Sequence, residues 1–336
     1  MRALLVTLCA CGATTTAPSA PAPDSAPASG APGWESVETI SNDGTVISER
    51  VTYRVDGLLV QGRVCRPADD GRHAVAIYNH GGFSGLTADP LLSLCEQTAR
   101  YGYVWLGSSY RGEDGSDGQI EVCLGEVDDV LAMLDIALAQ PYADPQHAVM
   151  WGGSHGGCIT LRALERGAPV RAAAALYPPS DIAEVFRFWQ AQIAANDPQK
   201  ALYQQLSQIV QAATGGTPDA VPQQYAARSP GGFVAQLPAT PLLVIHGTAD
   251  VLVPVSQSCG LAAQAQLVSY HLDSSQAVSA AAPAQCTVAF ATTAYPRPAW
   301  PGPHYFVAYD GLGHDISGPI FEQAEQDVAS FLMAKL

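Results

Sequence analysis

The sequence predicts one α/β domain with a mostly parallel eight-stranded sheet, helices on both faces and a helical cap insertion. From Trp34 onward, short apolar runs rich in branched residues alternate with helical patterns, which is the order of elements in a parallel sheet covered by helices. With 336 residues, 48% of them hydrophobic and only 14% charged, the chain can bury a large core. A polar helical stretch at about 181–235 interrupts the alternation and predicts the cap. We therefore expect a single domain over 34–336.

The expected strands fall into two groups. Residues 49–55 and 58–65 predict an antiparallel hairpin, because Asp56-Gly57 favours a tight turn between them. Later runs are short and apolar, as strands covered on both faces should be: 74–78, 104–107, 148–151, 172–176, 242–245 and 305–309. Helical patterns lie at 89–101, 125–138, 155–166, 256–266 and 319–333.

The start of the chain indicates export. Residues 1–11 contain one positive charge, a short apolar run and Leu8-Cys9-Ala10-Cys11, which resembles the bacterial lipobox and would make a lipidated Cys11 the mature N-terminus. An ordinary secretory signal or a misassigned start codon is the alternative. Residues 12–33, rich in Ala, Pro, Ser and Thr, cannot bury enough surface to offset their ordering entropy and predict a disordered tether. We expect an exported protein, either a bacterial cell-envelope lipoprotein or a secreted one, that meets a membrane only through this lipid anchor.

The net charge of −15 argues against nucleic acid as a partner, because phosphate backbones require a basic surface. No later stretch approaches the roughly 20 apolar residues of a spanning helix.

The nucleophile is expected in the run Ala-Val-Met-Trp-Gly-Gly-Ser-His-Gly-Gly at 148–157. A strand, a tight turn and a helix follow one another here, and G-x-S-x-G surrounds Ser154. Small residues two before and two after the serine let its oxygen stand exposed on a sharp turn without clashes. Because G-x-S-x-G also occurs by chance in glycine-rich chains, the strand before it and the helix after it carry the assignment.

An acid and a base are expected further along, in the order Ser, acid, His. Asp250 follows the strand at 242–245, at the edge of the sheet where ligands meet open α/β folds. His314 follows the last strand in a glycine-containing turn. Taken singly, such an Asp is more often a helix cap and such a His more often structural. Three matches in the required order favour the triad, whereas Asp315 lies in the wrong element to orient the base.

The second oxyanion donor is expected in the turn after the first central strand, Asn-His-Gly-Gly-Phe at 79–83. We expect the backbone N–H of His155 and that of Phe83 or Gly82 to hold the oxyanion. His80 is interpreted as structural, its ring holding the loop, and His246 as a turn residue. The other histidines lack ligand spacing, so we expect no metal and no cofactor.

Together, the motifs resemble α/β-hydrolases, in particular the catalytic domain of the prolyl oligopeptidase family and its dienelactone-hydrolase-like esterase relatives. The resemblance covers nearly everything from Arg50 onward and implies the α/β-hydrolase fold and the triad, while saying much less about substrate. It rests on Asn-His-Gly-Gly at 79–82, Tyr-Arg-Gly at 110–112, Asp-Pro at 144–145, Gly-Gly-Ser-His-Gly-Gly at 152–157, Ala-Arg-Ser-Pro at 227–230, His-Gly-Thr-Ala-Asp at 246–250 with Val-Pro at 253–254, and Gly-His at 313–314.

Two departures from the family are visible. Too few residues precede the first hairpin for the N-terminal β-propeller of the family's peptidases, which counts against a peptidase. The interval from Asp250 to His314 is longer than the resemblance implies, and the excess at about 272–303 predicts an ordered loop near the edge of the active site.

Six cysteines follow the first two, an even number in a chain expected to be exported, where disulfides persist. They allow 15 connectivities. We predict Cys259–Cys286, because Cys259 begins the helix after the Asp250 turn and Cys286 lies in the returning segment. The alternative is that these two pair elsewhere or stay free. Cys123–Cys158 is the next pair to test, since both lie near helix starts that flank the serine turn.

We expect an exported serine hydrolase that cleaves carboxylic esters of a small molecule or a polymer through an acyl-enzyme. The alternative is a peptidase of prolyl oligopeptidase type, whose amine anchor would come from the acidic loop at 113–117, although a solvated loop is the stronger interpretation of those carboxylates. A non-catalytic binding protein is the third hypothesis, and it predicts a broken triad. Aromatic candidates for lining the substrate site are Phe83, Tyr110, Trp189 and Trp300.

Overall fold

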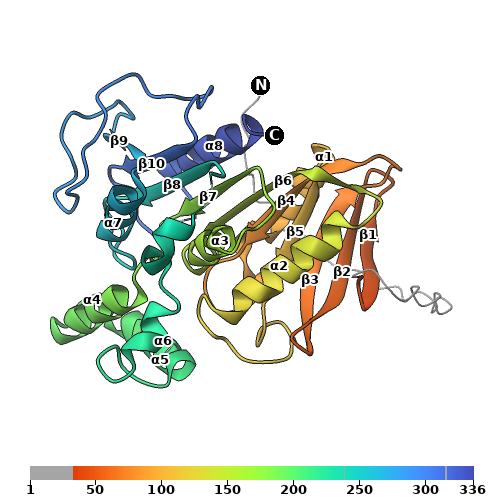
Figure 1. Cartoon of the computed structure of the whole chain (residues 1–336), viewed down its shortest axis with the longest axis horizontal. Coiled ribbons are helices and arrows are strands. Elements are labelled where there is room, and N and C mark those ends of the chain that lie inside the picture. Colours follow the sequence, from red (N-terminus) through yellow and green to blue (C-terminus); the bar gives the residue numbers. More distant parts are fainter. Residues whose placement is uncertain (1–32, 238, 315) are drawn as a thin grey trace, which may run out of the picture. The chain divides into compact units, whose positions relative to one another are not determined.

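The computed structural model describes residues 33–237, 239–314 and 316–336. The expected signal with Cys11, the tether up to residue 32, and Asp315 lie outside the described residues. Within them the chain forms a ten-stranded sheet flanked by helices (Figure 1). The strands are β1 (Ser36–Asn42), β2 (Val46–Val55), β3 (Leu58–Pro67), β4 (His73–Asn79), β5 (Val104–Ser108), β6 (Ala143–Gly153), β7 (Ala172–Leu176), β8 (Leu242–Gly247), β9 (Val268–Leu272) and β10 (His304–Tyr309).

The α-helices and 3-10 helices lie between these strands or follow them. They are η1 (Leu86–Ala88), η2 (Pro90–Ser93), α1 (Leu94–Arg100), α2 (Gly125–Leu138), α3 (His155–Glu165), α4 (Ile182–Ala194), α5 (Lys200–Thr214), α6 (Pro222–Ala226), η3 (Pro230–Gln236), α7 (Ser256–Ala265) and α8 (Pro319–Met333).

The strand order is β1-β2-β3-β5-β4-β6-β7-β8-β10-β9. Strands β1 to β3 pair antiparallel, and from β5 to β9 every neighbouring pair is parallel. This confirms the predicted α/β-hydrolase fold with its mostly parallel sheet. The hairpin turn lies at Asp56-Gly57, where both residues have positive φ, the backbone that a two-residue turn of this kind requires.

The predicted number of eight strands is wrong, because the structure adds a strand at each edge of the sheet. All of β1 is exposed, so it has no buried face that would leave an alternation in the sequence. In β9, Ser269 and His271 interrupt the apolar run although both are buried.

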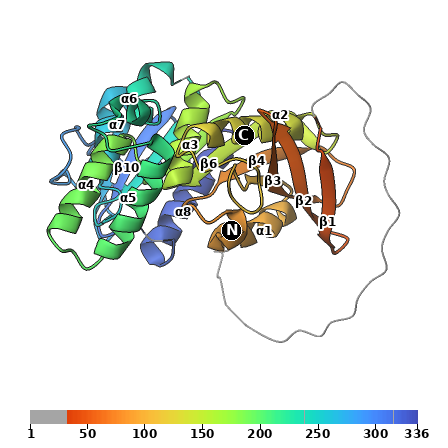
Figure 2. The same cartoon turned by 90° about the horizontal axis from the view of Figure 1, so that it is seen from below.

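Helices cover both faces of the sheet. Figure 2 shows α2 and α3 on one side and α1 and α8 on the other. The alternation within β4 explains the two layers, since successive side chains of a strand point to opposite faces. Val75 and Ile77 join the core under α2, α3 and α7, whereas Ala76 joins the core under α8 and Tyr78 the core under α1.

Helices α4, α5 and α6 form a group beside the sheet in the region where the cap was expected (Figure 1). Two of them contact the turn that follows Asp250. Trp189 on α4 donates its indole N–H to the carbonyl of Leu252 at 2.8 Å, and Tyr203 on α5 donates its hydroxyl to the carbonyl of Val251 at 2.9 Å. This helical group is therefore joined to the loop that carries the predicted acid.

Three disulfides join the six cysteines of the described chain. Cys259–Cys286 is the pair predicted from sequence, Cys123–Cys158 is the pair named as the next to test, and the third is Cys65–Cys95. Disulfides persist in oxidising compartments, so they indicate an extracellular protein. No helix in the described part of the chain is both long enough and apolar enough to span a bilayer.

The long segment between β9 and β10 is attached to α8 by a buried carboxyl group. Asp327 of α8 is fully buried and accepts hydrogen bonds from the hydroxyls of Tyr295 in this segment and Tyr309 in β10. Trp300 is also fully buried and donates its indole N–H to Ser330 Oγ of α8 at 2.9 Å. These contacts join the segment to the element that follows His314.

Candidate active site

The predicted triad residues follow strands that are close neighbours in the sheet. Ser154 follows β6, Asp250 lies three residues after β8, and His314 lies in the turn after β10, while β7 lies between β6 and β8. Because these strands are parallel, their carboxyl ends meet at one edge, where open α/β sheets bind ligands.

Ser154 occupies the sharp turn between β6 and α3. Its φ is 56° and ψ is −122°, a backbone conformation that side-chain-bearing residues rarely adopt and that marks strained functional turns. A Cβ at Gly152 would lie 2.6 Å from the carbonyl oxygen of Asn79, so only glycine fits between the elbow and the end of β4. The backbone N–H of Ser154 donates to the carbonyl of Leu176 at 3.0 Å, which joins the turn to β7.

His314 and Asp250 are directly hydrogen-bonded. His314 Nδ1 lies 2.7 Å from Asp250 Oδ2, and the Asp250 side chain is fully buried whereas 14% of the His314 side chain is exposed. A carboxylate can only accept here, so Nδ1 carries the proton and Nε2 keeps its lone pair. This is the tautomer that a general base needs.

Asp250 is held as a charged group. Its Oδ1 accepts backbone N–H bonds from Leu252 and Val253, each at 2.9 Å, and its Oδ2 also lies 3.4 Å from His246 Nε2. Burial by itself would raise the pKa of Asp250, but hydrogen bonds with His246 and His314 hold it well below its usual range. His246 was expected to be a simple turn residue. Its fully buried ring, 2.7 Å from Ser258 Oγ and 2.8 Å from the carbonyl of Val253, makes it a support for the acid loop that the sequence did not reveal.

Tyr177 is a further site residue that sequence reasoning missed. It follows β7 directly, has a φ of 38°, and its ring centroid lies 4.5 Å from that of His314. A Cβ at Gly153, next to the nucleophile, would lie 3.0 Å from the Tyr177 ring. The ring therefore lies against both the base and the elbow. The sequence did offer one indication of this role. Tyr177 follows a predicted strand that lies between the strands preceding Ser154 and Asp250.

The predicted oxyanion loop lies against the elbow. A Cβ at Gly81 would come within 3.4 Å of the Cβ of Ser154. Phe83 is partly buried, and its ring centroid lies 4.7 Å from that of His155, whereas Gly82 is exposed with a φ of 70°. Gly82, Phe83 and His155, the three predicted donors, are thus brought together beside Ser154.

Behind this loop lies a buried pair of titratable groups. The His80 ring is stacked on Tyr110 with centroids 4.1 Å apart, and its Nδ1 lies 3.0 Å from the carbonyl of Gly81, in agreement with a structural role. Its Nε2 is buried without a hydrogen bond, 3.9 Å from Glu113 Oε2. Burial lowers the pKa of His80 to about 4 and raises the pKa of Glu113 to about 8, so both are neutral near pH 7.

The acidic loop is solvated in part, because Asp117 is exposed and Asp114 is half-buried, whereas Glu113 is buried. Glu113 is buried and accepts the backbone N–H of Gly85, and Asp114 accepts from the hydroxyl and the N–H of Thr87. Asp117 accepts the backbone N–H of Leu59 at 2.9 Å. Glu113 is therefore a poor candidate for anchoring a peptide amine, because it is buried, while a role of Asp114 or Asp117 stays a prediction.

Two of the four aromatic candidates do not reach a surface. Tyr110 and Trp300 are both fully buried, Tyr110 against His80 and Trp300 in the core under α8, so their expected roles in substrate binding are wrong. Their large apolar rings stabilise the fold instead. Trp189 is 7% exposed and Phe83 is partly buried, so for these two a role in substrate binding stays a prediction.

No group of three or more His, Cys, Asp or Glu side chains within the described ranges is arranged to hold a metal ion. The described residues bring a hydrogen-bonded His314–Asp250 pair, Ser154 on its sharp turn and nearby backbone N–H groups to one edge of the sheet.

The model of the prolyl oligopeptidase family matches residues 99–278, a range that includes Ser154 and Asp250. Among curated proteins, the chain is similar to YtmA, an uncharacterized peptidase of Bacillus subtilis strain 168. The two are 26% identical over 211 residues, which are 62% of this chain and 75% of YtmA. A second uncharacterized peptidase of that strain, YuxL, is 25% identical over 232 residues, which cover 63% of this chain and 32% of YuxL.

Solved structures of two kinds of hydrolase share the fold. The acylaminoacyl peptidase of Pyrococcus horikoshii superposes with a TM-score of 0.63 at 18% identity, covering 87% of this chain. This chain spans only 42% of the length of that peptidase. The acetyl xylan esterase of Paenibacillus sp. R4 has a TM-score of 0.60 at 17% identity and is covered over 88% of its length by 90% of this chain.

Proposed function

The chain belongs to the prolyl oligopeptidase family of serine hydrolases, and we propose that it cleaves peptide bonds through an acyl-enzyme on Ser154. The family match over residues 99–278 carries this proposal, because it includes the elbow with Ser154 and the turn with Asp250. The 2.7 Å hydrogen bond between His314 and Asp250 supports the role of His314, which lies beyond the matched range.

The proposed mechanism uses this chain's own residues. His314 Nε2 removes the proton from Ser154 Oγ as that oxygen attacks the carbonyl carbon, and it then gives the proton to the leaving amine. Asp250 stabilises the imidazolium that forms. Water, activated by His314, hydrolyses the acyl-enzyme and releases the acid product. The backbone N–H of His155 and that of Gly82 or Phe83 hold the negative oxygen of both tetrahedral intermediates.

Ester hydrolysis is the second candidate, and the fold shared with the acetyl xylan esterase, which is matched over 88% of its length, supports it. Burial of Glu113 also removes one of the three carboxyl groups that could anchor the amine of an aminopeptidase substrate in the loop at 113–117. The family membership and the similarity to two uncharacterized peptidases support peptide bonds as the first candidate.

A matched pair of substrates tests this proposal. N-acylated dipeptides would be offered as the p-nitroanilide and as the ethyl ester of the same acyl group, with wild-type protein and Ser154→Ala. A peptidase turns over both substrates, and Ser154→Ala abolishes both activities. Turnover of the ester alone overturns the peptidase proposal in favour of the esterase, and activity that survives in Ser154→Ala overturns both.

Export with lipid attachment at Cys11 is part of this proposal, and the three disulfides support the export. Metabolic labelling with palmitate in a bacterial host tests it. Label should enter the wild-type chain and be absent from Cys11→Ser, and an unlabelled wild type contradicts lipidation.

A further inference from the structure

The ring of Tyr177 lies against the base and against the backbone next to the nucleophile. Its centroid is 4.5 Å from that of the His314 imidazole, with an angle of 53° between the two planes. A Cβ at Gly153, the residue before Ser154, would lie 3.0 Å from both the hydroxyl oxygen and a ring carbon of Tyr177. Only 4% of Tyr177 is exposed. One buried aromatic ring therefore contacts two of the three elements that carry the predicted triad.

The peptide group between Leu176 and Tyr177 joins the elbow to the strand of the acid. Its carbonyl accepts the backbone N–H of Ser154 at 3.0 Å, and its N–H donates to the carbonyl of Ile245 at 2.6 Å. Because C=O and N–H of a trans peptide point in opposite directions, this group lies between the serine turn and β8, which precedes Asp250. The Cα of Tyr177 is thus held at a fixed place between the nucleophile and the acid.

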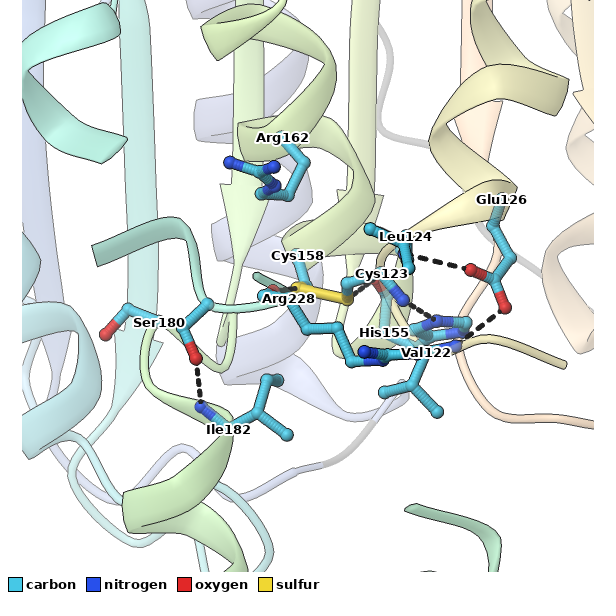
Figure 3. The surroundings of a disulfide bond; sticks show 12 residues. Val122, Cys123, Leu124, Glu126, His155, Cys158, Arg162, Ser180, Ile182 and Arg228 are labelled. Carbon is cyan, nitrogen blue, oxygen red and sulfur yellow. Dashed lines mark hydrogen bonds between the residues drawn. A yellow bond between two sulfur atoms is a disulfide. The ribbon is translucent and has the colours of Figure 1, made fainter. Parts of the chain in front are cut away.

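The residues on both sides of Tyr177 pack against α3. A Cβ at Gly157 of this helix would lie 2.9 Å from the carbonyl oxygen of Leu176 and 3.2 Å from the Cβ of Pro178. Figure 3 shows Ser180, three residues after Tyr177, in the surroundings of the disulfide in the first turn of α3. The ring of Tyr177 therefore projects from a backbone that is fixed on either side of it.

The backbone of Tyr177 is strained. Its φ is 38°, in the left-handed region that glycine adopts without steric cost and that residues with a side chain rarely adopt. Strained residues of this kind persist only where the surrounding structure holds them, and they gather at functional sites. The strain therefore marks a functional position, and the contacts of the ring indicate which function it serves.

The imidazole of His314 needs a second contact, because a single hydrogen bond fixes only one corner of it. Asp250 Oδ2 holds Nδ1 at 2.7 Å. The ring can still tilt about that hydrogen bond, and a tilt moves Nε2, the atom that must receive the proton of Ser154 Oγ. The Tyr177 ring packs against the imidazole and restricts this tilt.

We infer that Tyr177 is a positioning residue, whose aromatic ring holds the His314 imidazole at the angle at which Nε2 faces Ser154 Oγ. The ring makes this contact, so the hydroxyl is not needed for the role. The inference rests on the proposed function, because the direction of Nε2 matters only if His314 takes the proton of the serine.

Two replacements of Tyr177 separate its aromatic ring from its bulk and its hydroxyl. Tyr177→Phe keeps the ring, whereas Tyr177→Leu keeps an apolar side chain without one. We expect Tyr177→Phe to retain kcat within about 3-fold. Tyr177→Leu should lose about 30-fold in kcat with KM within about 2-fold of wild type, because a misdirected catalytic group slows the chemical step. If Tyr177→Leu does not fold, Tyr177→Met, whose flexible side chain adapts to the same space, takes its place with the same expectation.

Tyr305→Leu is the matched control for loss of a buried ring. Tyr305 belongs to the same core under α8 as Tyr177 but lies at the start of β10, away from the carboxyl ends of the strands. This variant should lower the melting temperature and leave kcat unchanged. A fall in kcat as large as that of Tyr177→Leu would mean that general loosening of this core, and not the position of His314, controls turnover, and it would overturn the inference.

The inference also has a readout that needs no turnover. The Nδ1 proton of His314, held by Asp250, should give a downfield proton NMR signal in wild type and in Tyr177→Phe. In Tyr177→Leu the signal should broaden, because an imidazole that tilts breaks this hydrogen bond more often and exchanges its proton with water faster.

Equal kcat in Tyr177→Phe and Tyr177→Leu, a loss that appears in KM alone, or an unchanged Nδ1 signal in Tyr177→Leu overturns the inference. If no substrate is turned over and a fluorophosphonate does not label Ser154, the proposed function fails. The Nδ1 signal then still decides whether Tyr177 holds the imidazole of His314.

Discussion

Buried carboxyl groups lie both beside the base, His314, and beside the nucleophile, Ser154, but their pKa values are shifted in opposite directions. On the base side, two histidine contacts hold the pKa of Asp250 well below its usual range in spite of burial. On the nucleophile side, burial raises the pKa of Glu113 to about 8 and also raises that of Glu126. Both of these carboxyls accept backbone N–H bonds from the loops next to the oxyanion donors.

The difference follows from the charge that each side must stabilise. Asp250 faces a histidine that becomes positive during the reaction, so a negative carboxylate helps. Glu113 supports the loop where negative charge develops, and a second negative charge there would oppose the oxyanion. A neutral carboxyl can hold the loop without that electrostatic cost.

Replacing each carboxyl by its amide is the strongest test of this contrast. Asp250→Asn should lower kcat by about 10³ to 10⁴, because the amide cannot stabilise the imidazolium and favours the wrong tautomer of His314. Its Oδ1 can still accept from Leu252 and Val253, so the fold should persist. Glu113→Gln, the matched control, should lower kcat by less than about 10-fold. Similar kcat values for the two variants would contradict the contrast.

Removing the disulfides separates fold stability from activity. The double variants Cys123→Ser/Cys158→Ser and Cys259→Ser/Cys286→Ser open loops with sequence separations of 35 and 27. Each should lower the free energy of unfolding by roughly 3 to 4 kcal/mol on chain-entropy grounds. Only the first should also lower kcat at a temperature where both are folded, by about 10-fold, since the backbone N–H of Cys123 donates to Nε2 of His155, the residue after the nucleophile. Urea denaturation and steady-state kinetics measure the two effects, and an equal loss of kcat in both variants would count against the role of Cys123.

Glu113 should also leave a signature in the pH dependence of stability. Its pKa is raised in the folded state to about 8 from a usual 4.5, so between these values the unfolded chain has released a proton that the folded chain retains. Stability from this group is therefore lost as pH rises from about 4.5 to about 8. Relative to wild type, Glu113→Gln should gain stability across that window, by about 1.4 kcal/mol for each tenfold difference in proton affinity between the folded and unfolded chains. A stability difference that stays constant from pH 5 to pH 8 would mean that Glu113 is ionised in the fold.

The parts of the fold that leave a local pattern could be predicted from the sequence. The hairpin at Asp56-Gly57, the buried parallel strands, α2 and α8 each depend on residues within one element, and the structure has them. The two edge strands were missed because β1 has no buried face and β9 contains buried polar residues. β1 pairs with β2, the next strand in the chain, whereas β9 pairs with β10 across the long segment between them.

The same distinction applies to the site. The motifs at the strand ends identified the elbow, Asp250 and His314, because the order of these residues along the chain can be read from the sequence. His246 and Tyr177 were missed as site residues. The role of His246 comes from the way the turn after β8 returns Asp250 to its ring, and the role of Tyr177 from its contact with His314, which follows a different strand. Tyr110 and Trp300 were misjudged because a large aromatic in the sequence does not reveal whether its surroundings are solvent or core.

The most direct test of the central claim is covalent labelling of Ser154. A fluorophosphonate probe should modify the wild-type protein at this residue, as identified by mass spectrometry of the peptide around 148–166. The label should be absent from Ser154→Ala, whose kcat should fall by about 10⁴ to 10⁶ while its melting temperature stays near that of wild type. Label on a different residue, or wild-type turnover in Ser154→Ala, would contradict the account.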